Sequence, residues 1–207
     1  MSRIKTPEAI LSYPHLFEPQ ESDEPGQKAK YSCALIFPEG TDLTALKKAV
    51  VEAAKEEWGD KAVQMIRSGE ARSPFRTDWE KKGYPENSTF FNARSTRKPG
   101  IVSTIPDPNT GLPMKIDDPE EMYPGAIVLA GVSVFTYDRK GNKGVGFGLD
   151  VLQKIRDSER LDNAVNAQDF FEADENAAAD LDDVLDDEAL GDGAPEGSDD
   201  LDVSALI

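Results

Sequence analysis

Alternating apolar and polar residues, or a high content of β-branched and aromatic residues, predict strands in five segments of the chain. These segments are residues 7–18, 30–37, 89–96, 125–137 and 145–151. Prolines flank the apolar run of the first segment, which predicts an edge strand with an irregular end. A glycine-rich turn at 138–144 joins the last two segments and predicts a β-hairpin.

Between the second and third segments, the apolar period changes to that of a helix. The recurring apolar positions are Leu43, Leu46, Val50, Ala53 and Trp58. Thr41 or Asp42 can accept a hydrogen bond from a free backbone N–H at the helix start, and Gly59 is the expected stop. A shorter helix is predicted at 61–67, before Gly69.

The order of these elements predicts a mainly β protein with one main helix inserted between the second and third strands. Residues 70–88 and 105–125 contain glycine, proline and charges without a period, so we expect long loops there. A five-stranded antiparallel barrel with an inserted helix is the economical architecture, and the OB-fold is its best-known example. A half-open sandwich is the main alternative.

Charge divides the chain into two parts. The whole sequence has 40 acidic and 23 basic residues, a formal net charge of −17. Residues 161–207 hold 16 acidic residues and no basic ones, so residues 1–160 carry 24 acidic and 23 basic residues. Because the last segment has few large apolar side chains, we expect a disordered acidic tail after a folded domain at 1–160.

The composition argues against several classes of protein. The single cysteine, Cys33, excludes an internal disulfide and a cysteine-rich zinc site, and it alternates with core residues. The single histidine, His15, has no evident partner for a catalytic triad. No run of about 18 apolar residues occurs and no secretory signal is evident, so we expect a cytoplasmic protein without membrane contact.

Cationic and aromatic residues alternate between Arg72 and Lys98, and smaller groups of both kinds lie at 28–31 and 137–143. Cations at this density can follow a phosphate backbone, and aromatic rings between them can stack on unpaired bases. The candidate DNA-binding residues are Lys28, Lys30, Arg76, Trp79, Lys81, Lys82, Tyr84, Phe91, Arg94, Arg97, Lys98, Tyr137, Arg139 and Lys143. The alternative is that the rings anchor the loop to the core and the cations keep it soluble. Phe90 and Phe91 point to opposite faces of a strand, so at most one can stack on DNA.

The tail ends in an apolar tip rather than in acid. A purely solubilising tail has no need of this tip, whereas acid followed by an apolar end suits a peptide that docks into a basic-rimmed pocket. The candidate partner-binding residues are Asp199, Asp200, Asp202, Leu206 and Ile207. The same tail can also fold back onto a basic groove of the protein and compete with nucleic acid there.

Catalytic interpretations are weaker. Asp117, Asp118, Glu120 and Glu121 form a carboxylate cluster that could hold magnesium, but their proline-rich context favours a solvated loop. The closely spaced glycines of 141–146 join two strands rather than opening a helix, so they do not form a phosphate-binding loop. We expect no enzymatic activity and no cofactor.

The sequence resembles a family of bacteriophage single-stranded DNA-binding proteins over about residues 8–160, and in the type of tail. The resemblance is carried by Leu-Ser-Tyr-Pro-His-Leu-Phe-Glu-Pro at 11–19, Lys-Tyr-Ser-Cys-Ala-Leu-Ile-Phe-Pro at 30–38, Phe-Asn-Ala at 91–93, Gly-Asn-Lys-Gly at 141–144 and Val-Leu-Gln-Lys-Ile-Arg-Asp at 151–157. It implies an OB-fold, non-sequence-specific binding of single-stranded DNA (ssDNA) in phage replication, recombination and repair, and an acidic tail that recruits replication proteins.

We therefore expect an ssDNA-binding protein in the cytoplasm of a bacterial host. Its body binds DNA, and its tail recruits a polymerase, helicase or primase and competes with DNA. A monomer or a weak dimer fits this expectation. The alternative is an acidic protein-interaction or DNA-mimic factor whose body never touches nucleic acid, and a magnesium-dependent nuclease is the third possibility.

Overall fold

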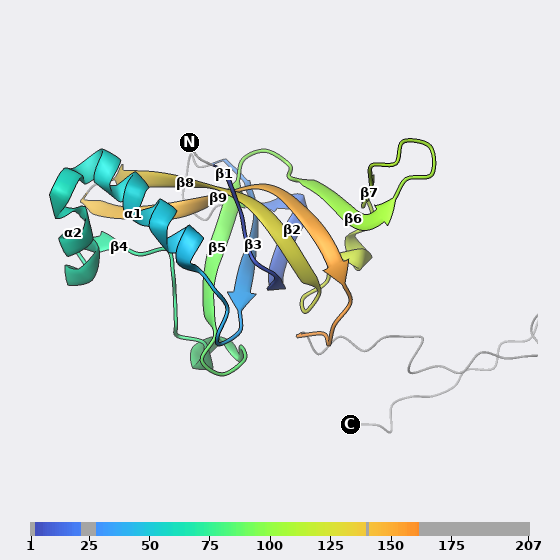
Figure 1. Cartoon of the computed structure of the whole chain (residues 1–207), viewed down its shortest axis with the longest axis horizontal. Coiled ribbons are helices and arrows are strands. Elements are labelled where there is room, and N and C mark those ends of the chain that lie inside the picture. The colour runs from blue at the N-terminus through green and yellow to red at the C-terminus, as the bar shows by residue number, and fades with distance from the viewer. Residues whose placement is uncertain (1–2, 22–27, 140, 162–207) are drawn as a thin grey trace, which may run out of the picture. The chain divides into compact units, whose positions relative to one another are not determined.

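Nine strands joined in one sheet form the framework of the chain that the computed structural model describes, which is residues 3–21, 28–139 and 141–161. The strands are β1 (Arg3–Lys5), β2 (Ala9–Gln20), β3 (Lys30–Phe37), β4 (Ala71–Arg72), β5 (Thr89–Ser95), β6 (Gly100–Pro106), β7 (Pro113–Lys115), β8 (Ile127–Arg139) and β9 (Asn142–Arg156). The helices are α1 (Thr44–Trp58) and α2 (Ala62–Ser68), with short 3-10 turns η1 (Gly59–Lys61), η2 (Glu80–Lys82) and η3 (Pro119–Glu121). The predicted mainly β class with one main helix is confirmed (Figure 1).

Five of these strands pair in a closed circuit. β2 pairs with β3 and β8, β3 pairs with β5, and β9 pairs with both β5 and β8. The β5–β9 ladder is parallel, with Ala93 opposite Phe147 and Arg94 opposite Gly148, so the prediction of a wholly antiparallel circuit is wrong there. Since β6, β7 and β8 separate these two strands along the chain, no tight turn forces them to run antiparallel.

The edge-strand prediction for the first segment is also corrected. Ala9 and Ile10 at the start of β2 pair with β8, and Ile10 pairs with β3 on its other side. The irregular end is confirmed, because the β2–β3 register shifts between Ser12 and His15 and again before Gln20. A proline inside a strand has no N–H to donate, and a bulge is the usual way to accommodate it.

The hairpin of β8 and β9 is confirmed. Its turn is shorter than the predicted 138–144, because Arg139 lies opposite Asn142. β6 was not predicted, since no strand was expected between residues 96 and 125, whereas the chain turns after β5 and β6 forms a parallel ladder with β9. β7 pairs with β6 inside the segment that was predicted to be a loop.

Helix α1 begins at Thr44, slightly later than predicted, and the Asp42 carboxylate accepts a hydrogen bond of 2.9 Å from the Thr44 N–H. Its buried face consists of Leu46, Val50 and Ala54, which belong to the main core. Both helices end at the predicted glycines, Gly59 and Gly69, with φ of 65° and 80°.

The two faces of β3 and β5 contact different clusters. Inward-facing residues such as Leu35 and Phe91 belong to the main core. On the opposite face, Ile36 and Phe90 pack with Tyr84 in a second cluster, and the backbone of Arg76 pairs with that of Phe90. Residues 76–84 of the segment between α2 and β5 therefore pack on the outer face of the sheet, which brings their cations there, whereas Phe75 packs against the main core. None of the helices among the described residues has the length and apolarity needed to cross a membrane.

Candidate nucleic-acid interface

One row of register partners crosses six strands on the outer face of the sheet. In order from β2 through β3, β5, β9 and β8 to β1, these residues are His15, Ser32, Arg94, Gly148, Ser133 and Arg3. The row faces outward because Cys33, Ala93 and Phe147, each one residue along its strand, are buried in the core. No carboxylate occurs in this row, so it offers hydroxyl, imidazole and guanidinium groups suited to phosphate contacts.

The first hollow along this row is a cleft of about 280 Å³ over β2, β3 and β5, which we call the β2–β3–β5 cleft. Three cations and several rings line it, and no carboxylate does among the described residues. The lining residues are Tyr13, His15, Gln20, Ser32, Cys33, Ala34, Arg76, Lys82, Tyr84, Phe90, Asn92 and Arg94. Cations beside exposed ring surface are the combination that unpaired nucleotides require.

Tyr13 is the most exposed ring at this cleft, with 58% of its surface accessible. The Nζ atom of Lys82 lies 5.7 Å from the centre of its ring. Tyr13 also has a φ of 44°, an unusual backbone conformation for a residue other than glycine. Sequence reasoning missed Tyr13, although Pro14, which interrupts the strand pattern, is the signal that the chain bulges here and turns this side chain outward.

Arg76 is held in place by a carboxylate and a ring. Its Nε and Nη2 atoms donate to Asp78 at 3.0 and 2.6 Å, and its guanidinium lies 5.1 Å from the centre of the Phe90 ring. The hydrogen bond from Arg76 lowers the pKa of the Asp78 carboxyl, so the pair stays charged to a lower pH than an isolated aspartate would. The charge of Arg76 is therefore largely offset, and Lys82 and Arg94 carry most of the positive potential of this cleft.

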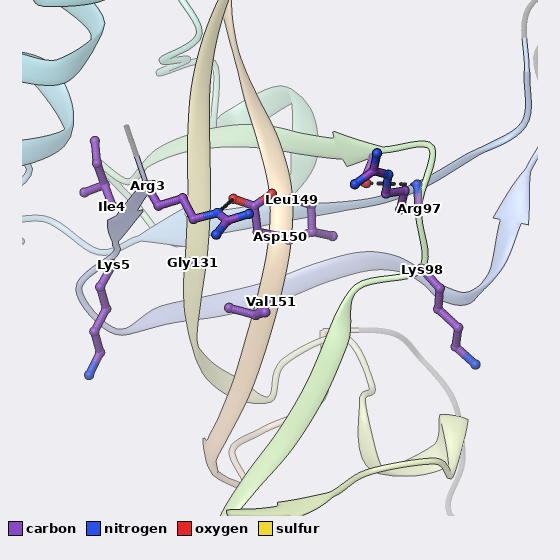
Figure 2. Close-up of a pocket in the computed structure, with 10 residues that line it drawn as sticks. Arg3, Ile4, Lys5, Arg97, Lys98, Gly131, Leu149, Asp150 and Val151 are labelled. Atoms are coloured by element: carbon purple, nitrogen blue, oxygen red, sulfur yellow. Dashed lines mark hydrogen bonds and ion pairs between the residues drawn. The ribbon is translucent and has the colours of Figure 1, made fainter. Parts of the chain in front are cut away.

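The second hollow, the β1–β9 cleft, has a volume of about 560 Å³ and lies between β1, β9 and the turn after β5 (Figure 2). Arg3 reaches across β8 to Asp150, with its Nε atom 3.4 Å from Oδ2. Lys5 and Lys98 extend away from this pair, and the Arg97 backbone N–H donates to Ser95 Oγ at 3.0 Å. No aromatic side chain lines this cleft among the described residues.

The structure brings some of the predicted residues together and separates others. Arg76, Lys82, Tyr84 and Arg94 line the β2–β3–β5 cleft, and Arg97 and Lys98 line the β1–β9 cleft. Lys28 is exposed, Lys30 lies opposite Gln20, Lys81 is exposed on η2, and Tyr137 and Lys143 lie on the β8–β9 hairpin. Trp79 is half-buried against the second cluster, and the side chain of Arg139 lies outside the described part of the chain.

Two predicted stacking residues are buried instead. Phe91 is 0% exposed and packs against Phe147 with ring centres 4.1 Å apart. Tyr84 is 8% exposed and its hydroxyl donates to Ser12 Oγ at 3.2 Å. A covered ring offers no face to a base, so we correct the assignment of both residues and leave them out of the interface.

The remaining candidates from the sequence have structural roles or are not described. Asp117 pairs with Lys115 at 2.5 Å, and the Asp118 side chain accepts from the Glu120 N–H at the start of η3. Within the described ranges, no three histidine, cysteine or acidic side chains gather as a metal site.

Cys33 is a core residue as predicted, and burial raises its pKa to about 12. The tail residues Asp199, Asp200, Asp202, Leu206 and Ile207 lie outside the described residues.

Comparison with known proteins identifies the family. The family model of the ssDNA-binding protein of Enterobacter phage Enc34 matches residues 2–184. The chain belongs to this family. No curated protein matches the sequence.

Solved structures of phage ssDNA-binding proteins share the fold. The ssDNA-binding protein of bacteriophage Enc34, solved in complex with ssDNA, is 23% identical, with a TM-score of 0.59 over 77% of this chain and 89% of that one. The ssDNA-binding protein gp2.5 of bacteriophage T7 is 13% identical, with a TM-score of 0.55 over 81% of this chain and 99% of that one. The mainly β fold with its helix is thus consistent with the OB folds of ssDNA-binding proteins.

Proposed function

We propose that this protein binds ssDNA without sequence preference, along the outer face of a five-stranded OB barrel formed by β2, β3, β5, β9 and β8. The observation that carries this proposal is the row from His15 to Arg3, which joins two cation-lined clefts without an intervening carboxylate. A phosphate backbone that follows the row meets positive charge at both ends. Family membership supports the same conclusion.

We expect the cations of the two clefts to set the strength of the electrostatic contribution to binding. Seven cations line them, and two of these, Arg76 and Arg3, are paired with Asp78 and Asp150. The other five are Lys5, Lys82, Arg94, Arg97 and Lys98. For a single strand, each phosphate contact contributes about −0.7 to the slope of log K against log salt concentration. Five contacts therefore predict a slope near −3.5.

The expected preference for single strands follows from the exposed ring of Tyr13. Tyr13 presents an accessible ring beside Lys82, and stacking on a base requires that the base be unpaired. The bases of a duplex are already stacked and paired, so a duplex can use only the phosphate contacts. We therefore expect ssDNA to bind more tightly than a duplex of equal length at every salt concentration.

We further propose that the protein acts in phage DNA replication, recombination and repair, and that its acidic tail recruits a polymerase, helicase or primase. The carboxylates of Asp199, Asp200 and Asp202 precede the apolar Leu206 and Ile207. Such a tail competes with DNA for the cationic clefts and is released when phosphates occupy them. Replacing the three aspartates with asparagine is then expected to tighten ssDNA binding.

The test is a fluorescence-anisotropy titration of a labelled oligo-dT with the full-length protein, at two salt concentrations and with unlabelled duplex as competitor. We expect tight binding that weakens with salt and that duplex displaces poorly. Absence of binding by the full chain and by the triple Asp→Asn tail variant would contradict the proposal. That result would favour an acidic protein-interaction or DNA-mimic factor.

A further inference from the structure

Three glycines occupy the outward-facing positions of one stretch of β9. Gly144, Gly146 and Gly148 alternate with Val145 and Phe147, which are buried in the core. Glycine weakens a strand because it costs backbone entropy and offers no side chain to pack. A strand that carries three of them on one face usually does so because something lies close against its backbone.

Side chains of β8 lie on this glycine surface. Phe135 pairs with Gly146, and Tyr137 pairs with Gly144. A Cβ atom built on Gly146 would lie 2.7 Å from Cζ of Phe135, and one on Gly144 would lie 2.5 Å from the Tyr137 hydroxyl oxygen. The rings are therefore laid down over the backbone of β9, which only glycine permits.

The rings keep a solvent-facing side. Phe135 is 36% exposed and Tyr137 is half-buried. Their centres are 6.5 Å apart and their planes differ by 50°. This separation is nearly twice the 3.4 Å rise per nucleotide of a B-DNA strand, so the two rings suit two bases of an extended single strand.

The glycine surface continues the outward-facing row. Gly148 and Ser133 belong to the row, and Phe135 lies two residues beyond Ser133 on the same face of β8. Arg94, which lines the β2–β3–β5 cleft, is the register partner of Gly148, so a cation of this cleft lies beside the glycine surface. A single DNA strand that runs from this cleft along β9 would meet Arg94 first and the two rings next.

We infer that Phe135 and Tyr137, supported by Gly146 and Gly144, form a base-stacking platform that extends the ssDNA interface onto the β8–β9 hairpin. This inference rests on the proposed ssDNA binding. The glycines of residues 144–148 do not form a phosphate-binding loop, and the platform gives Gly144 and Gly146 a role as support for the two rings. Aromatic side chains over glycine can also serve only to cover a strand, and the experiment separates the two roles.

The experiment compares Phe135→Leu with Phe135→Tyr in the full-length protein. The probes are labelled oligo-dT and an abasic oligonucleotide of the same length, which keeps the phosphates and lacks the bases. Loss of one stacked base is expected to weaken oligo-dT binding by about 5- to 150-fold for Phe135→Leu. Binding of the abasic probe stays unchanged, and Phe135→Tyr retains wild-type affinity for both probes. Ile105→Ala, which alters an exposed apolar residue on β6, is the matched control and is expected to bind as wild type.

Gly146→Ala provides a second variant that leaves both rings in the chain. Its methyl group displaces the Phe135 ring from β9, so weaker oligo-dT binding is again expected with unchanged binding of the abasic probe. Wild-type affinity of Phe135→Leu for oligo-dT overturns the platform while the salt-sensitive binding of the wild type still supports the proposed function. Equal losses on both probes, together with a lower melting temperature, also overturn it in favour of a covering role. If the wild-type protein binds neither probe, both proposals fail.

Discussion

The two clefts on the outer face are lined by similar numbers of cations but differ in their aromatic and acidic residues. The β2–β3–β5 cleft has three cations beside the exposed ring of Tyr13, whereas the rings of Tyr84 and Phe90 that also line it are buried. The β1–β9 cleft is lined by four cations and, within the described part of the chain, by no ring, and Asp150, which pairs with Arg3, also lines it. Rings allow stacking on bases, whereas cations alone recognise only phosphates. Under the proposed function, we expect the first cleft to distinguish single strands from duplex and the second to add affinity without this preference.

The largest expected effect comes from Tyr13→Ala. Loss of a stacked base costs about 1–3 kcal/mol, so oligo-dT binding should weaken by about 5- to 150-fold while binding of an abasic oligonucleotide barely changes. Tyr13→Phe keeps the ring and serves as the control. Anisotropy titrations with both probes check this prediction, and equal losses on the two probes would remove the distinction between the clefts.

The double variant Arg97→Ala with Lys98→Ala tests the second cleft. Loss of two phosphate contacts should make the slope of log K against log salt shallower by about 1.4 and weaken binding roughly 25-fold near 0.1 M salt. The loss should be the same for oligo-dT and for the abasic probe, because no base is involved, and the slope change for duplex should be about 1.8, since each duplex phosphate contributes about 0.9. A larger loss on oligo-dT than on the abasic probe would show that this cleft also contacts bases.

Asp150→Asn should act in the opposite direction. Removal of this carboxylate frees Arg3, whose Nε atom lies 3.4 Å from Asp150 Oδ2, to contact a phosphate. We expect tighter binding by up to about fivefold and a salt slope steeper by about 0.7. The Arg3→Ala, Asp150→Asn double variant is the control and should lose this gain. Unchanged affinity in the single variant would show that DNA does not reach Arg3.

The smallest effect is expected at Cys33, whose thiol lies beneath the β2–β3–β5 cleft. Burial raises its pKa from the ordinary 9.0 to about 12, so at pH 8 almost all of it is the unreactive neutral thiol. A thiol reagent at pH 8 should modify denatured protein but leave native protein unmodified, with or without oligo-dT. Rapid modification of the native protein would mean that this cleft opens deeper than the structure shows.

The inward faces of the strands were predictable from alternation alone. Leu35 and Phe37 on β3 and Phe147 on β9 occupy alternating apolar positions of their strands, and all three are buried. Helix α1 was equally predictable from its apolar period and from Gly59. Packing imposes both patterns on neighbouring residues, so they can be recognised within one segment of sequence.

The outward row could not be predicted, because its six members come from six strands and only the register aligns them. Arg94 was predicted from local charge density, but nothing local connects it to Ser32, Gly148 or Arg3. The misassignment of Tyr84 has the same origin. Its segment folds over the outer face of β3 and β5, and tertiary contact rather than sequence pattern buries the ring.

The most direct test of the central claim is the salt dependence of oligo-dT binding by the wild-type protein and by Arg94→Ala, since Arg94 lies in the middle of the outward row. Lys55→Ala, on helix α1 away from the row, is the control. We predict a wild-type slope near −3.5 that becomes shallower by about 0.7 in Arg94→Ala and is unchanged in Lys55→Ala. Superimposable curves for wild type and Arg94→Ala would show that the DNA does not follow this row.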